Sequence, residues 1–284
     1  MSAPELLAAY FTISGDVYPF GSNEVSPFLF EHRVEAAARA GYKGIGLVHP
    51  DLMATKDRLG YTEMNRIMHA NGIKHIEFEF LADWYKSGAE RRASDVMRSE
   101  FFEAAEALNA RAVKVAPGLN EAEAQADVTR MVDCFGELAV KAAQHGTALT
   151  LEIMPFSNVR SIDMARRIVE GAGQANGGLL IDIWHLARSG INFSDIAQID
   201  PTYIGGIELN DADHYPVQPL WLDTIHRRRL PGEGALDVQA FVRAVQATGF
   251  KGPWGVEILS ESHRRLPLNE MARLSFETSI AQFS

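Results

Sequence analysis

Four short apolar segments of the sequence each carry one acidic residue. They read LTLEIM (149–154), LLIDIWH (179–185), IGGIELN (204–210) and WGVEIL (254–259), and their acids are Glu152, Asp182, Glu208 and Glu257. A carboxylate is a poor strand residue, and burying its charge without a partner is costly. Because the pattern repeats four times, we expect the acids to serve one purpose.

Acids that share one site repel each other, so the cluster persists only if some of the acids are protonated or a cation binds between them. A divalent metal ion is the simplest solution. Oxygen ligands suit Mn²⁺ or Mg²⁺, and nearby imidazoles extend the choice to Co²⁺ or Zn²⁺. The sequence therefore predicts one divalent metal ion. For any single acid, the alternative is a strand-end residue held by a hydrogen bond or a salt bridge.

Strand-like and helical segments alternate along the chain at intervals of roughly 30 residues, which predicts βαβ units and a parallel sheet. Eight units in 284 residues fit a single α/β domain, a (β/α)8 TIM barrel over residues 1–284. A doubly wound sheet is the alternative, but no G-x-G-x-x-G follows the first strand. The predicted strands are 6–14, 44–49, 73–80, 112–117, 147–154, 178–184, 203–210 and 252–259.

The predicted helices have suitable signals at their ends. Ser161 and Asp237 are placed as N-caps, and glycines follow several helices. The sixth helix, near 192–199, has the weakest pattern. The other predicted helices are 26–41, 61–72, 89–110, 121–146, 161–173, 237–249 and 267–283.

The acids should converge at one end of this barrel. In a strand, alternate side chains point to opposite faces. Asp182 lies between Ile181 and Ile183, so if the isoleucines face the helices, the acid faces the interior. Each of the other three acids likewise lies between two apolar residues. All four acids lie near the C-terminal ends of their strands, where barrel enzymes carry out their chemistry.

Composition excludes several classes of function. The net charge of −10 opposes binding to nucleic acid. The single Cys134 rules out an intramolecular disulfide framework and a thiolate zinc cluster. The N-terminal sequence lacks the features of a signal peptide, and no apolar run is long enough to span a membrane. We therefore expect a cytoplasmic protein with a small-molecule partner.

The chain resembles the sugar phosphate isomerase/epimerase superfamily, the xylose isomerase-like barrels, over essentially its whole length. The resemblance rests on E-x-M-P-F (152–156), D-I-W-H (182–185), L-N-D (209–211), R-R-x-P-G-E-G (228–234) and Glu257. It implies that Glu152, Asp182 and Glu257 bind a divalent metal. The fourth ligand position falls on Glu208, where the family usually has histidine. Glu208 is the favoured ligand here, and His214 is the alternative.

The resemblance also implies substrate contacts. His185 would contact a substrate oxygen, and an arginine before the P-G-E-G turn would hold another. That arginine is Arg228 or Arg229, and the sequence does not decide between them. His226 is a weaker neighbour.

Other polar residues have the inward parity or lie at strand ends. Glu79 and His49 are candidates for substrate contact, and Lys114 either neutralises the acids or binds a substrate hydroxyl. His75 is expected to be a hydrogen-bonded structural residue. Aromatic side chains just beyond strand ends would form a wall against a sugar ring or simply pack: Trp84, Phe156 and Trp184.

The implied reaction is isomerisation or epimerisation of a sugar, keto-sugar or related polyol. A metal would stabilise the enediolate, while Glu152 and Glu257 remove and return a proton next to the carbonyl. The same enolate can expel a β-substituent. A lyase of this superfamily, such as a 3-dehydroshikimate dehydratase or an enzyme that eliminates from 3-keto-glycosides, is therefore the alternative.

Two other readings are more remote. An endonuclease IV-like enzyme would need further zinc ligands and a basic surface, and a non-catalytic sugar-binding barrel would need no acid/base pair. Dimers and tetramers are common in the family that the chain resembles, so a homo-oligomer is compatible with the resemblance, and the sequence leaves this point open.

Overall fold

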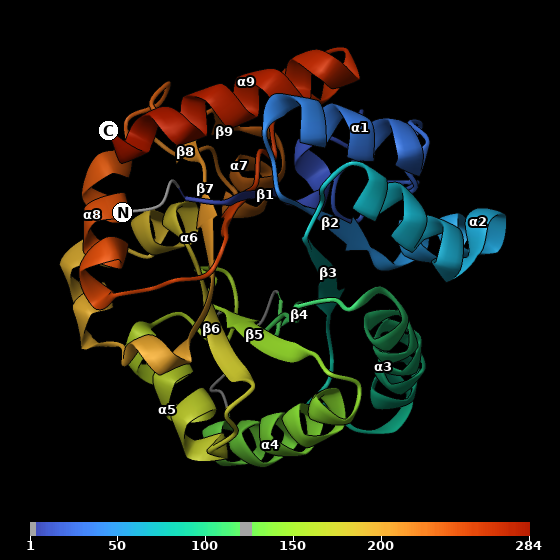
Figure 1. Ribbon diagram of the computed structural model, residues 1–284. Helices are drawn as coiled ribbons and strands as arrows, with labels where there is room; N and C mark the ends of the chain where they lie inside the picture. The colour runs from blue at the N-terminus through green and yellow to red at the C-terminus, as the bar shows by residue number, and fades with distance from the viewer. Residues whose placement is uncertain (1–3, 120–126) are drawn as a thin grey trace. The chain divides into compact units, whose positions relative to one another are not determined.

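The computed structural model describes residues 4–119 and 127–284, whose helices and strands are labelled in Figure 1. Strand pairing closes the strands into a barrel. The order around the barrel is β1, β10, β7, β6, β5, β4, β3 and β2, with β1 paired to β2. Closure confirms the predicted TIM barrel and excludes the doubly wound alternative. The strands are β1 (Leu6–Ala8), β2 (Gly44–Val48), β3 (His75–Leu81), β4 (Ala112–Val115), β5 (Ala148–Glu152), β6 (Gly177–Asp182), β7 (Ile204–Leu209) and β10 (Trp254–Val256).

Helices alternate with these strands, as the sequence predicts. The α-helices are α1 (Phe30–Ala40), α2 (His49–Ala70), α3 (Gly88–Leu108), α4 (Val128–Gln144), α5 (Ile162–Ala172), α6 (Ile183–Arg188), α7 (Leu220–His226), α8 (Val238–Thr248) and α9 (Leu268–Ile280). Short 3-10 helices are η1 (Tyr10–Thr12), η2 (Phe193–Gln198), η3 (Pro201–Tyr203), η4 (His263–Arg265) and η5 (Ala281–Phe283). A separate two-stranded sheet joins β8 (Asp211–Ala212) to β9 (Arg228–Arg229).

The chain divides into two compact units. Unit 1 consists of Met1–Glu77, Glu208–Val242 and Pro253–Ser284, and unit 2 consists of Phe78–Ile207 and Arg243–Gly252.

In unit 1, β1 pairs in parallel with both β10 and β2. Leu6 lies opposite Trp254, and Leu7 lies opposite Gly44. Gly44 must be small, because a Cβ there would lie 2.7 Å from the His75 Cβ and 2.8 Å from the Leu7 Cδ1. Close strand packing therefore explains this glycine.

In unit 2, β4, β5 and β6 pair in parallel, with Lys114 opposite Thr150 and Glu152 opposite Leu180. Helices α4 and α5 pack against each other, and their buried faces include Phe135 and Ile168. Apolar burial of this kind is the main favourable term in folding. It holds the strand ends that carry the acids.

All eight predicted strands exist, although several are shorter than expected. The first one ends at Ala8 instead of residue 14, because the backbone N–H of Thr12 turns back to Ala9 O at 3.1 Å and forms η1. The weak sixth helix is also corrected. Helix α6 begins directly after β6, and the predicted segment 192–199 contains only the 3-10 helix η2.

Several other helix bounds also differ from the prediction, and the first helix begins at Phe30 instead of residue 26. Helix α2 starts at His49 rather than residue 61, and it continues across a non-helical residue, Gly60, with φ 70°. Part of the predicted helix 121–146 lies outside the described residues, and Val128–Gln144 of it is helical. Both predicted N-caps are confirmed, since Ser161 Oγ accepts from Met164 N and Asp237 Oδ1 accepts from Ala240 N. None of the described helices has the length and apolar character needed to cross a membrane.

Candidate active site

Unit 2 carries two of the acids as a close pair. Glu152 is the last residue of β5, and Asp182 is the last residue of the neighbouring strand β6. Because Glu152 lies opposite Leu180, Asp182 shares the face of Glu152 two residues further along. An oxygen of each carboxylate lies within 4.8 Å of the other, and both side chains are buried. The two acids are therefore neighbours on one face of the sheet, as the side-chain period of two in adjacent strands predicts.

His185 joins this pair. Its Nε2 atom lies 3.1 Å from Glu152 Oε1, and its backbone N–H donates to Asp182 Oδ1 at 3.0 Å. Asp182 is thus the N-cap of α6, which gives its burial a local structural cause, namely the hydrogen-bonded strand-end role that the sequence also allowed for a single acid. The rings of Trp184 and Phe156 meet the His185 imidazole edge-on, with centroids 5.0 Å and 5.8 Å away.

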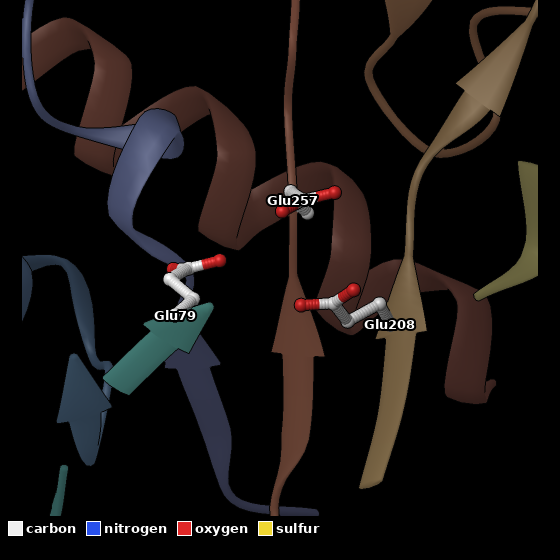
Figure 2. A group of neighbouring side chains, drawn as sticks. All are labelled: Glu79, Glu208 and Glu257. Atoms are coloured by element: carbon white, nitrogen blue, oxygen red, sulfur yellow. The ribbon is translucent and has the colours of Figure 1, made fainter. Parts of the chain in front are cut away.

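Unit 1 carries the other two acids, again as a close pair. Glu208 lies in β7, and Glu257 directly follows β10, where its N–H donates to Leu209 O at 3.0 Å. Their nearest carboxylate oxygens lie within 4.8 Å, and both side chains are buried. Figure 2 shows the Glu208 carboxylate extending toward β10 and the segment after it that carries Glu257.

Arg228 forms an ion pair with Glu257, one of the two acids of this second pair. Its Nη1 atom lies 2.8 Å from Glu257 Oε2, and its Nη2 atom donates to Thr224 Oγ1 at 2.9 Å. The side chain is only 1% exposed. Arg229, by contrast, is exposed and binds Asp213 at 2.9 Å. Of the two arginines that the sequence left open, Arg228 is therefore the one that contacts a site acid.

Asp211 holds the chain segment that follows Arg228. Its carboxylate accepts backbone N–H groups from Gly232 at 2.9 Å and Gly234 at 3.0 Å, and from Leu236 at 2.9 Å. A Cβ at Gly234 would lie 2.3 Å from Asp211 Oδ1, so only glycine fits. Sequence reasoning alone does not link the L-N-D motif to the P-G-E-G motif, although both are part of the family resemblance. The available signal was that the acid and the glycine-rich turn lie in the same predicted loop between two strands.

The acid near the end of β3 has a cationic partner. Lys114 Nζ lies 3.2 Å from Glu79 Oε2, and both side chains are buried in unit 2. Glu79 is also labelled in Figure 2. The ion pair gives Lys114 a buried carboxylate partner, Glu79.

A protein-family model described as "Xylose isomerase-like TIM barrel" matches residues 34–278 of this chain. The chain belongs to this family. Its resemblance to the sugar phosphate isomerase/epimerase superfamily is thereby confirmed.

Curated relatives of this family member are enzymes of two kinds. A 3-dehydroshikimate dehydratase of Pseudomonas aeruginosa is 26% identical over 238 residues, which cover 83% of this chain and 37% of the relative. An inosose isomerase of Halalkalibacterium halodurans is 26% identical over 225 residues, which cover 77% of this chain and 78% of the relative. The chain thus spans little more than a third of the dehydratase.

A solved structure supports the same fold. The IOLI protein with a binding zinc atom superimposes with a TM-score of 0.84 and 20% identity, covering 98% of this chain and 97% of that chain.

The buried carboxylates of this protein, together with His185, suit a hard or borderline divalent cation. Each unit presents two buried carboxylates within 4.8 Å of each other. Like charges at this separation favour a shared cation, and carboxylate oxygens suit Mn²⁺, Mg²⁺ and, with imidazole, Zn²⁺. The residues present therefore fit a metal.

The remaining candidates lie at varied places. His49 is half-buried as the first residue of α2. His75 binds Glu5 at 2.7 Å, which agrees with its expected structural role. Trp84 donates its Nε1–H to Ala116 O at 2.7 Å. The alternative ligand His214 is exposed and stacks edge-on against Tyr215, so burial favours Glu208 over it.

Proposed function

We propose that this protein is a divalent-metal-dependent isomerase or epimerase of a sugar, keto-sugar or related polyol. One observation carries the proposal: two pairs of buried carboxylates, each pair within 4.8 Å, lie at the ends of strands that are consecutive around the barrel, β5, β6, β7 and β10. The C-terminal ends of the strands form the catalytic face of TIM barrels.

The proposed metal ligands are Glu152, Asp182, Glu208 and Glu257. When bound, the metal would stabilise the negative charge that develops on the substrate oxygens as a proton leaves the adjacent carbon. Mn²⁺ or Mg²⁺ best matches four carboxylates, and Co²⁺ or Zn²⁺ becomes compatible if His185 contributes.

Glu152 and Glu257 are the proposed acid/base residues. His185 lies 3.1 Å from Glu152, and Arg228 lies 2.8 Å from Glu257, so each carboxylate is held by a polar neighbour in its own unit. One carboxylate removes the proton next to the carbonyl and the other returns it. Return to the opposite face gives an epimer, and return to the neighbouring carbon gives an isomer.

The other proposed substrate contacts are residues of the strand ends and the loops beyond them. His185 and Arg228 would contact substrate oxygens, and Glu79 with Lys114 would bind hydroxyl groups. His49 and Arg229 complete the set.

Metal content is the decisive test. We expect near-stoichiometric metal in the purified or metal-loaded protein, and loss of that metal in Asp182→Asn and in Glu208→Gln. Glu63→Gln is the matched control, because Glu63 is a surface acid that pairs with Arg66. If the protein binds none of the four metals after loading, the proposal is wrong. If Glu208→Gln keeps the metal, Glu208 is not a ligand.

Proton transfer is tested separately by solvent exchange. In D₂O, the loaded enzyme should place deuterium next to the carbonyl of a ketose or an inosose. Glu152→Gln and Glu257→Gln should each slow that exchange by about 10²–10⁴-fold. Unchanged exchange in both variants would remove them as acid/base residues.

A dehydratase is the second candidate, since a dehydratase relative matches 83% of this chain. It would use the same acids to form the enolate and would then expel a hydroxyl group. Mass spectrometry of the product separates the two, because elimination removes one water and isomerisation preserves the mass.

A further inference from the structure

We infer that a pocket beside Arg228 binds an oxyanion, a carboxylate or a phosphate, carried by the substrate of the proposed site. The pocket has a volume of about 390 Å³ and is lined by residues of segments 226–229 and 260–265. Both segments belong to unit 1. This inference rests on the proposed function and specifies the class of its substrate.

Backbone pairing fixes the two walls of the pocket. Arg227 and Ser260 form an antiparallel bridge. On either side of it, Arg228 N donates to Leu259 O at 3.1 Å and Glu261 N donates to His226 O at 2.9 Å. The side chains of both segments therefore extend from a hydrogen-bonded pair of backbone segments.

Positive charge dominates the lining. Four arginines line the pocket, at positions 227, 228, 229 and 265, against one acid, Glu261. Arginine guanidinium groups match carboxylate and phosphate oxygens in a two-pronged geometry. Such a lining favours an anionic ligand over a neutral polyol.

Neighbouring acids position these arginines. Asp213 binds Arg227 at 3.1 Å and Arg229 at 2.9 Å, and Glu261 binds Arg265 at 2.9 Å. Asp16 lies 3.3 Å from Arg265. A guanidinium has five N–H donors, so the single carboxylate that binds Arg227 and Arg229, and the two that bind Arg265, leave donors for a further oxyanion. Exposed ion pairs of this kind are also weak, and an incoming oxyanion can compete with them.

Neutral donors complete the lining. The hydroxyl oxygens of Ser260 and Ser262 lie 3.2 Å apart. Arg264 Nη1 donates to His226 Nδ1 at 2.9 Å, which leaves the proton of the neutral imidazole on Nε2. Burial, together with the charge of Arg264, lowers the pKa of His226, so the ring is a neutral donor near pH 7.

Arg228 connects the pocket to the proposed chemistry. It lines the pocket and also binds Glu257 at 2.8 Å. An oxyanion held here would therefore lie one side chain away from a proposed acid/base residue. Loops after the last two strands often bind phosphate in TIM barrels, and these segments follow β7 and β10.

The test measures binding of inorganic phosphate to the metal-loaded protein by calorimetry. Arg227→Gln/Arg229→Gln should weaken that binding by about tenfold or more, because charged hydrogen bonds are lost. Arg273→Gln is the matched control, since Arg273 is 46% exposed and pairs with Glu270 and Glu277 on α9. Its phosphate binding should equal that of the wild type.

Matched ligands identify the source of the oxyanion. D-gluconate is compared with D-glucitol, and glucose 6-phosphate with glucose, as competitors of phosphate. Preference for gluconate indicates a carboxylate substrate, and preference for the sugar phosphate indicates a phosphorylated one. If the charged and the neutral ligand of each pair compete equally well with phosphate, the inference is wrong.

Two further outcomes separate this inference from the proposed function. Unchanged phosphate binding in the double variant, with loss in Asp182→Asn, would place the anion at the metal and refute the pocket. The metal content of the double variant is measured in parallel and should equal that of the wild type. A protein that binds phosphate through the arginines but no metal would refute the proposed function alone.

Discussion

Arg228 Nη1 lies 2.8 Å from Glu257 Oε2, and this ion pair is almost completely shielded from solvent. Removing one partner of a buried pair leaves an uncompensated charge, which costs more than the pair contributes. We expect Arg228→Gln to lower the free energy of unfolding by about 3–5 kcal/mol. Urea denaturation measures the effect. Arg229→Gln is the control, because its exposed pair with Asp213 should cost less than about 1 kcal/mol.

Asp211 should position Arg228 through the backbone. Residues Asp211–Ala212 form β8, which pairs with Arg228–Arg229 of β9, and the Asp211 carboxylate also binds the turn that follows. Asp211→Asn exchanges one accepting oxygen for a donor that faces N–H groups. We expect about 1–3 kcal/mol of lost stability and a lower kcat, with metal content unchanged. Loss of metal in this variant would argue against a role limited to positioning.

A pair of glycine substitutions tests the same turn by steric means. Gly234→Ala would place a Cβ 2.3 Å from Asp211 Oδ1, whereas a Cβ at Gly136 would have its nearest contact at 3.7 Å. Gly234→Ala should destabilise the protein. Gly136→Ala lies inside helix α4 and should stabilise it by about 0.5–1 kcal/mol. Thermal unfolding compares them, and equal effects would contradict the close contact at Gly234.

Asp182 has two separable roles, capping α6 and the proposed binding of metal. Asparagine can still accept the His185 N–H but carries no charge. In metal-free protein, Asp182→Asn should keep nearly wild-type stability, while Asp182→Ala should lose about 1 kcal/mol. Added metal should raise the melting temperature of the wild type only. Stabilisation of either variant by metal would show that this carboxylate is not required.

His263 should make stability depend on pH. Burial lowers the pKa of His263 from 6.5 to about 4, and its Nε2 donates to Thr12 O at 2.9 Å. Between these two values the unfolded chain binds the proton and the folded one does not, so stability is full above pH 6.5 and falls as the pH drops toward 4. The loss attributable to this residue is about 3 kcal/mol.

His263→Gln measures that contribution. Glutamine can still donate to Thr12 O but does not titrate, so the variant should have a flatter stability profile over this pH range. Urea denaturation at several pH values gives the comparison. If the wild type and the variant have parallel profiles, another group causes the acid sensitivity.

The sequence determined the barrel and the strand positions of the acids. Alternating helices and strands have distinct local periods, and in a strand the side-chain period of two decides which residues share a face. Thus Glu152, Asp182, Glu208 and Glu257 could be placed near strand ends without a structure. The first and last residues of each strand and helix could not be predicted in this way. Local hydrogen bonds decide where an element ends, such as the one from Thr12 N to Ala9 O that follows the first strand.

Only the tertiary structure decided which loop residues contact these acids and each other. Arg228 and Arg229 are adjacent, and no local pattern tells which one turns inward, since pairing of β8 with β9 across the intervening helix α7 sets their register. Asp211 likewise meets Gly234 only because the chain folds back on itself. The same folding brings Ser260 beside Arg227. Contacts between residues far apart in sequence depend on the packing of the whole chain, which local periodicity does not encode.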